Sequence, residues 1–159
     1  MIVLGIDPGS RITGYGVVEK KNKYLIALLQ GEIKSTRQDS MSSFMVTMYN
    51  QLLQVIDRME PDAMAIEDTF YGKNVKSLMK QSHVRGVAIL AGAMRNVPVF
   101  EYSPLEVKQA VVGYGRAEKS QVQQMVTNIL HLSTIPPPDE SDALAVAICH
   151  INFLKVQPI

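Results

Sequence analysis

Four carboxylates stand at the ends of three predicted elements, where their side chains could do chemistry. Asp7 ends an apolar run just before a Pro-Gly turn, and Glu67 ends a second apolar run. Asp139 and Asp142 open an apolar helix at 143–154. Hard divalent cations prefer oxygen ligands, and two such ions about 4 Å apart can activate a water against a phosphodiester. The pattern therefore favours a divalent-metal site for phosphate chemistry.

Three of these acids also have a structural interpretation. Asp7 could cap the Pro-Gly turn that follows it. Asp139 and Asp142 are three residues apart, so they share one face of a helical first turn, where the helix dipole favours acids in any case. A metal site is favoured because three separate acidic element ends occur in one small chain.

Two further acids near strand ends are not predicted to bind metal. Asp68 directly follows Glu67, and strand alternation turns it to the opposite face of the sheet. Glu101 lies near the end of a later strand without a partner motif. The histidines form no ligand-like pair, so they are assigned no role; they are His83, His131 and His150.

Hydrophobic periodicity predicts the elements that position the acids. Strands are expected at 2–7, 13–19, 24–34, 63–67 and 97–102. Helices are expected at 41–59, 75–95, from 104, at 118–131 and at 143–154. Short turns make the first three strands antiparallel, and helical crossovers make the last two parallel. The fold class is α/β, with a mixed five-stranded sheet flanked by helices on both faces.

Six motifs follow one another along the chain, at residues 5–11, 13–18, 65–74, 107–113, 117–122 and 139–147. In this order and spacing they resemble the RuvC family of Holliday-junction resolvases. The resemblance extends from Ile2 to about Leu154. It implies a ribonuclease-H-like fold, a homodimer and an acidic quartet that holds two Mg²⁺ ions, for which Mn²⁺ may substitute. Carried over by motif, the quartet is Asp7, Glu67, Asp139 and Asp142, with Asp7 bridging both ions.

The same resemblance implies roles for three further side chains. Lys108 and Lys119 lie near the scissile phosphate in the family pattern, and Lys119 is counted with the catalytic residues. Phe70 corresponds to an aromatic that stacks on an unpaired base at the crossover. Such stacking can contribute about 1–3 kcal/mol per base. Taken alone, Phe70 could equally be an aromatic that packs in the core or a loop.

Basic residues follow the second acidic strand end. Residues 69–100 contain no acid but five basic side chains, and Lys73, Lys76 and Lys80 have the spacing of one helical stripe. Such a stripe is usually a solvated face. Beside a carboxylate site it predicts a track for DNA phosphates. The predicted DNA contacts also include Ser10, Arg11 and Asn74, which lie in the motifs of Asp7 and Glu67.

Composition limits the class of protein. The chain has 159 residues and a formal net charge of only +1, so any DNA-binding surface must come from charge distribution. We expect one nuclease domain at 1–155 and a frayed tail at 156–159. The sole cysteine, Cys149, is expected in the core. Without a signal peptide or a long apolar span, the expected location is cytoplasmic.

The predicted function is resolution of four-way DNA junctions by paired symmetric nicks that leave 5′-phosphate and 3′-hydroxyl ends. The helix at 75–95 is the candidate dimer interface, with Val84, Gly86, Val87, Ala88 and Leu90 as packing residues. The resemblance also implies work with a branch-migration helicase complex of the RuvA and RuvB type.

Two alternatives come from other classes of protein. Actin-like ATPases and sugar kinases open with a strand and a Gly/Ser turn like that at 5–10, but they need two large domains, for which 159 residues are too few. The second alternative is a module that binds junctions without cutting them. Four carboxylates beside DNA phosphate would serve no purpose in such a module.

Overall fold

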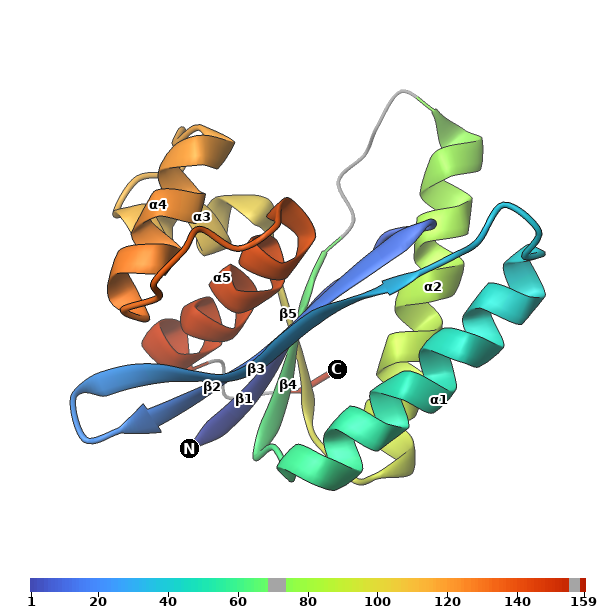
Figure 1. The fold of residues 1–159 in the computed structure, drawn as a ribbon, viewed down its shortest axis with the longest axis horizontal. Helices are drawn as coiled ribbons and strands as arrows, with labels where there is room; N and C mark the ends of the chain where they lie inside the picture. The colour runs from blue at the N-terminus through green and yellow to red at the C-terminus, as the bar shows by residue number, and fades with distance from the viewer. Residues whose placement is uncertain (69–73, 155–157) are drawn as a thin grey trace.

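The structure is a computed structural model that describes residues 1–68, 74–154 and 158–159. It contains one five-stranded sheet in the order β3-β2-β1-β4-β5 (Figure 1). The strands are β1 (Ile2–Asp7), β2 (Ile12–Lys21), β3 (Tyr24–Lys34), β4 (Ala63–Glu67) and β5 (Val99–Tyr102). β1, β2 and β3 pair antiparallel, whereas β4 is parallel to both β1 and β5. The predicted mixed sheet is confirmed.

Helices cover both faces of this sheet (Figure 1). They are α1 (Met41–Met59), α2 (Val75–Met94), α3 (Pro104–Val112), α4 (Lys119–Ile129) and α5 (Pro138–Phe153). α1 and α2 pack over a core that includes Leu4 and Ile66, whereas α3, α4 and α5 pack over a second core that includes Val3 and Ala65. Successive strand residues thus alternate between two hydrophobic layers.

Some element boundaries differ from the predicted ones. β5 begins at Val99 instead of residue 97, because the Val97 N–H is bonded at 3.0 Å to the Gly92 carbonyl of the preceding helix. α4 ends at Ile129, and His131 adopts a left-handed backbone with a φ of 51°. None of the helices in the described ranges is long and apolar enough to cross a membrane.

α5 lies directly on the backbone of β1 and β2 because glycines face it. A Cβ atom on Gly14 would overlap the carbonyl oxygen of Asp139, and one on Gly5 would overlap that of Ala143. From Ala143 to Ile151 every residue of α5 is buried. Because only a hydrogen fits at these strand positions, the start of α5 is brought against the carboxyl end of β1.

α2 buries one side and exposes an apolar stripe on the other. Val84 and Ala88 are fully buried in the core of the chain itself, so the prediction that they pack in a dimer interface is wrong. The exposed positions of this stripe recur at helical spacing on one face of α2. They are Val75, Met79, His83, Gly86, Leu90 and Met94.

The C-terminal residue touches the outer edge of the sheet. The Ile159 N–H donates a hydrogen bond of 2.9 Å to the Val99 carbonyl of β5. The predicted fraying of 156–159 stays a prediction, since residues 155–157 are outside the described part of the chain.

Candidate active site

Two carboxylates meet where β1 and β4 end. The register pairs Ile6 with Ile66, so Asp7 and Glu67 follow side by side on parallel strands. The preceding residues, Ile6 and Ile66, point into the core under α1 and α2. Because side chains alternate along a strand, Asp7 and Glu67 point to the other face of the sheet, toward α5. A hydrogen bond joins the two carboxyl groups, which requires a proton on one of them. The strand ends thus form the floor of an acidic site.

The first turn of α5 adds the other two acids. Asp139 and Asp142 face the same site, since the charge of each raises the pKa of Asp7. Asp142 Oδ2 lies 2.6 Å from Nζ of Lys119, the first residue of α4. The lysine therefore already neutralises one member of the quartet.

Burial and mutual repulsion make ionisation of the floor unfavourable. Burial, with the charges of Asp142 and Asp139, raises the pKa of Asp7 from 3.8 to about 7. Burial and the charges of Asp7 and Asp142 raise the pKa of Glu67 from 4.5 to about 8. Lys119 opposes both shifts without cancelling them. The site is thus short of positive charge at neutral pH.

A pocket of about 180 Å³ opens beside the acids. Its lining includes the carboxyl groups of Glu67 and Asp142 and the ammonium groups of Lys108 of α3 and Lys119. Apolar side chains, among them Val107, complete the lining. The pocket can take an anionic group next to the carboxylates.

The residues fit a hard divalent ion by their chemistry, because all four donors are carboxylates. Within the described residues, no three His, Cys, Asp or Glu side chains already form a closed metal cage. Instead, Lys119 pairs with Asp142, and the pKa values of Asp7 and Glu67 are both raised. A bound cation would favour the charged forms of these carboxyl groups.

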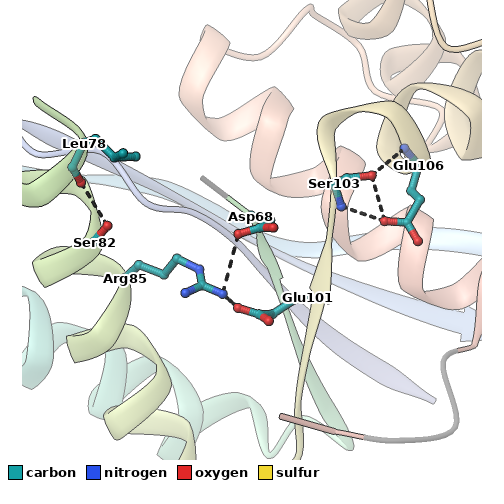
Figure 2. A network of polar contacts seen from close by, with 7 residues as sticks. All are labelled: Asp68, Leu78, Ser82, Arg85, Glu101, Ser103 and Glu106. Atoms are coloured by element: carbon teal, nitrogen blue, oxygen red, sulfur yellow. Dashed lines mark hydrogen bonds and ion pairs between the residues drawn. The ribbon is translucent and has the colours of Figure 1, made fainter. Parts of the chain in front are cut away.

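Asp68 is turned to the opposite face of the sheet, as predicted, and Glu101 lies beside it there (Figure 2). Both face Arg85 of α2 on the opposite side of the sheet. Arg85 Nη2 lies 3.9 Å from Asp68 Oδ1 and forms an ion pair with Glu101. These two acids are therefore held by an arginine and take no part in the acidic site.

The predicted DNA contacts are spread around the same end of the sheet. Lys76 and Lys80 are exposed on α2, whereas Lys108 lies in the pocket. Asn74 is the N-cap of α2 and accepts a hydrogen bond of 3.3 Å from the Ser77 N–H. Ser10 and Arg11 follow the end of β1, where Arg11 is exposed. Phe70 and Lys73 lie outside the described residues.

The basic segment at 69–100 is less basic at its surface than its composition suggests. Arg85 is neutralised by Glu101, and Arg95 forms a two-pronged ion pair with Asp57 of α1 at 2.5 and 2.9 Å. Among the described residues, the remaining basic side chains of this segment are Lys76 and Lys80, in the first two turns of α2.

Sequence reasoning missed the residues that fix the site from outside it. Gly14 of β2 allows the backbone of Asp139 to approach. Tyr102 and His150, which received no role, form a buried hydrogen bond of 2.8 Å between β5 and α5. Both are contacts between residues far apart in the chain, and no local pattern encodes them.

The raised carboxyl pKa values predict how the metal-free protein responds to pH. Between pH about 4 and about 8, folded Asp7 and Glu67 hold protons that the unfolded chain has released. The free energy of unfolding should therefore fall as pH rises through this window, and stay at its lower value above it. Thermal melts in a metal chelator at pH 5 and pH 9 measure the loss.

Asp7→Asn is the control for this pH response. The variant removes one of the two titrating groups, so its stability should change less between pH 5 and pH 9. Equal pH dependence of variant and wild type would contradict the assignment of the loss to these carboxyls.

The comparisons with known proteins agree with this geometry. The family Crossover junction endodeoxyribonuclease RuvC matches residues 3–150. The protein of that name from Ruminiclostridium cellulolyticum is 51% identical over 96% of this chain and 92% of its own length. That from Geobacter sulfurreducens is 49% identical over 100% of this chain and 97% of its own.

A solved structure covers the whole fold. T. thermophilus RuvC in complex with Holliday junction substrate has a TM-score of 0.94 and 33% identity, over 100% of this chain and 99% of that one. The family implies dependence on a divalent metal, and the buried carboxylates agree with it. The chain belongs to the RuvC family of crossover junction endodeoxyribonucleases.

Proposed function

We propose that this protein resolves four-way DNA junctions in recombination and repair, by two symmetric nicks that leave 5′-phosphate and 3′-hydroxyl ends. One observation supports this most strongly. Four acids from β1, β4 and α5 converge beside a pocket that two lysines line. Family membership then gives the site its substrate. The nuclease domain comprises residues 1–155.

The four acids hold the metal in this proposal. Two Mg²⁺ ions, or Mn²⁺ in their place, supply activation of water and stabilisation of the leaving oxygen. The ligands are Asp7, Glu67, Asp139 and Asp142, which the fold brings to one sheet end. Their raised pKa values support the assignment, since a nearby cation is what would favour their charged forms.

Lys119 and Lys108 bind the scissile phosphate. Burial lowers the pKa of Lys119, but its hydrogen bond to Asp142 and the surrounding carboxylate charges outweigh burial and raise it. The ammonium group therefore stays protonated at working pH. Its charge would then be available to a phosphate oxygen beside Asp142.

Other residues are proposed to deliver the DNA. Phe70 stacks on a base at the crossover, and Lys76 and Lys80 track phosphates along α2. Lys73, Ser10, Arg11 and Asn74 complete the contacts. Asn74 would contribute mainly by fixing the start of α2, since its side-chain oxygen already caps that helix.

The active form is proposed to be a homodimer built on the exposed stripe of α2. Met79, Leu90 and Met94 are each at least half exposed on this helix. Gly86 lies between them, and nothing described lies within 4 Å of where its Cβ would be. The α2 helices of two copies could therefore cross closely at Gly86. The two-fold axis of such a dimer would place its two active sites symmetrically, as the two opposed strands of a junction require.

Leu90→Glu tests this proposal. A charge in the stripe should make the protein a monomer by sedimentation at micromolar concentration, without loss of fold because Leu90 is 50% exposed. The wild type should cut opposed strands of a junction with a fixed crossover at symmetric positions. The monomer should give at most single nicks.

Lys23→Glu, in the β2–β3 turn far from α2, is the control and should stay dimeric with paired nicks. A dimeric Leu90→Glu protein would contradict the interface. A wild type without symmetric nicks would contradict the proposed function.

A partner complex and a cellular location follow from the family alone. We propose that the dimer acts with a branch-migration helicase complex of the RuvA and RuvB type. The relatives named above are bacterial, so we also propose that the protein works in the cytoplasm, where the bacterial chromosome lies.

A further inference from the structure

A second concave surface lies at the same end of the sheet, on the side covered by α1 and α2. It is a groove of about 570 Å³ lined by residues of the turn after β1, the β3–α1 connection, the start of α1 and α2. Its lining includes three cations, Arg11, Arg37 and Lys80. The lining also includes three residues with hydroxyl side chains, Ser35, Thr36 and Ser40. We call this surface the basic groove.

The cations of the basic groove are uncompensated. Among the described residues, no carboxylate lies within ion-pair distance of Arg11, Arg37 or Lys80. Elsewhere on the described surface, Arg85 and Arg95 are paired with acids. An unpaired set of three cations around one groove is suited to an external anion.

The one acid among the described lining residues is already engaged. Asp39 Oδ2 accepts a hydrogen bond of 2.6 Å from the Thr36 N–H, and this bond closes a turn that presents Arg37. The carboxylate therefore serves the backbone of the connection. Its charge reduces the positive field of the groove but does not pair with any of its cations.

Backbone hydrogen bonds hold the groove in shape. The Ser35 N–H donates to the Arg11 carbonyl at 2.8 Å, so the two loops that carry the arginines are tied together. Ser40 caps α1 and accepts from the Ser43 N–H at 3.1 Å. The groove is thus largely preorganised, and the ordering cost on binding falls mainly on the arginine and lysine side chains.

We propose that the basic groove binds the sugar-phosphate backbone of a duplex arm of the junction, away from the crossover. This inference rests on the proposed function and extends its DNA surface. Arginine, lysine and hydroxyl side chains are the usual partners of DNA phosphates. Lys80 belongs both to the groove and to the predicted basic stripe that it shares with Lys76, so the groove continues the phosphate track beyond the start of α2.

Arg37→Gln tests the groove, because Arg37 is exposed and was not among the predicted DNA contacts. Junction affinity should fall about three- to ten-fold at moderate salt, and the slope of log affinity against log salt should become shallower by about one. The measurement is equilibrium binding of the full-length protein to a long-armed junction across a salt series. As the arms are shortened stepwise, the difference in junction affinity between the variant and the wild type should decrease to zero.

Arg58→Gln is the matched control. It removes the same charge from the last turn of α1, about 21 Å along that helix from Phe44 in the groove lining, at 1.5 Å per residue. Its affinity and salt slope should match those of the wild type. If Arg37→Gln also matches the wild type while the wild type cuts junctions, the groove proposal is wrong and the proposed function stands. If the wild type cuts no junctions, the function itself is wrong.

Discussion

Replacing Asp7 with asparagine should lower junction cleavage at least about a thousand-fold, equivalent to about 4 kcal/mol of transition-state stabilisation. Asp7 is the acid that contacts Glu67 and feels the charges of both Asp139 and Asp142, so it is central to the quartet. An amide of nearly the same shape keeps the packing but loses the charge that holds a cation. Single-turnover cleavage of a synthetic junction measures the loss.

Binding and stability separate this loss from unfolding. Junction affinity should remain, because the basic side chains are untouched. The metal-free variant should be at least as stable as the wild type at pH 8, since it lacks one carboxylate whose ionisation burial disfavours. A variant that unfolds would instead show that Asp7 serves the fold.

Asp68→Asn is the matched control for Asp7→Asn. It makes the same chemical change one residue beyond Glu67, on the side of the sheet that faces Arg85. Cleavage should stay within a few-fold of wild type. A loss as large as that of Asp7→Asn would mean that the wrong face of the sheet has been assigned to the chemistry.

Gly14→Ala should lower cleavage about a hundred-fold without removing any ligand. The new methyl group overlaps the Asp139 carbonyl, so the first turn of α5 must move away from the end of β1. Overpacking of this kind costs about 1–3 kcal/mol of stability. The displaced Asp139 should also raise the Mg²⁺ concentration needed for half-maximal cleavage, which a metal titration measures.

Gly92→Ala controls for overpacking alone. Its methyl group would press on Val99 and Met64 on the opposite side of the sheet, away from α5. The melting temperature should fall. At temperatures where the variant is still folded, the Mg²⁺ concentration for half-maximal cleavage should equal that of the wild type. If both variants shift the metal requirement equally, the effect is general loosening and Gly14 has no special part in placing Asp139.

Local sequence patterns predicted the sheet and the strand ends at Asp7 and Glu67, for physical reasons. The apolar runs that end at Asp7 and Glu67 make their strands recognisable, and parallel pairing then brings the strand ends together. Alternation within a strand likewise assigned Asp68 to the opposite face. These features depend on residues that lie only two or three positions apart, and such spacing is visible in the sequence itself.

Features that depend on which distant surfaces meet could not be read in the same way. Val84 and Ala88 look suited to a dimer interface, but the core of the chain itself covers them. The basic character assigned to 69–100 is reduced by Glu101 and Asp57, which lie outside that segment. The basic groove joins Arg11 to Arg37 through the pairing of β2 with β3, which tertiary structure alone defines.

The central claim is a metal-dependent acidic site that acts on junction DNA. The most direct measurement compares cleavage of a synthetic four-way junction with that of a linear duplex of equal sequence, each with and without Mg²⁺. We expect paired nicks in the junction only when Mg²⁺ is present, and no comparable cutting of the duplex. Equal cleavage of duplex and junction, or junction cleavage that persists in a metal chelator, would contradict the account.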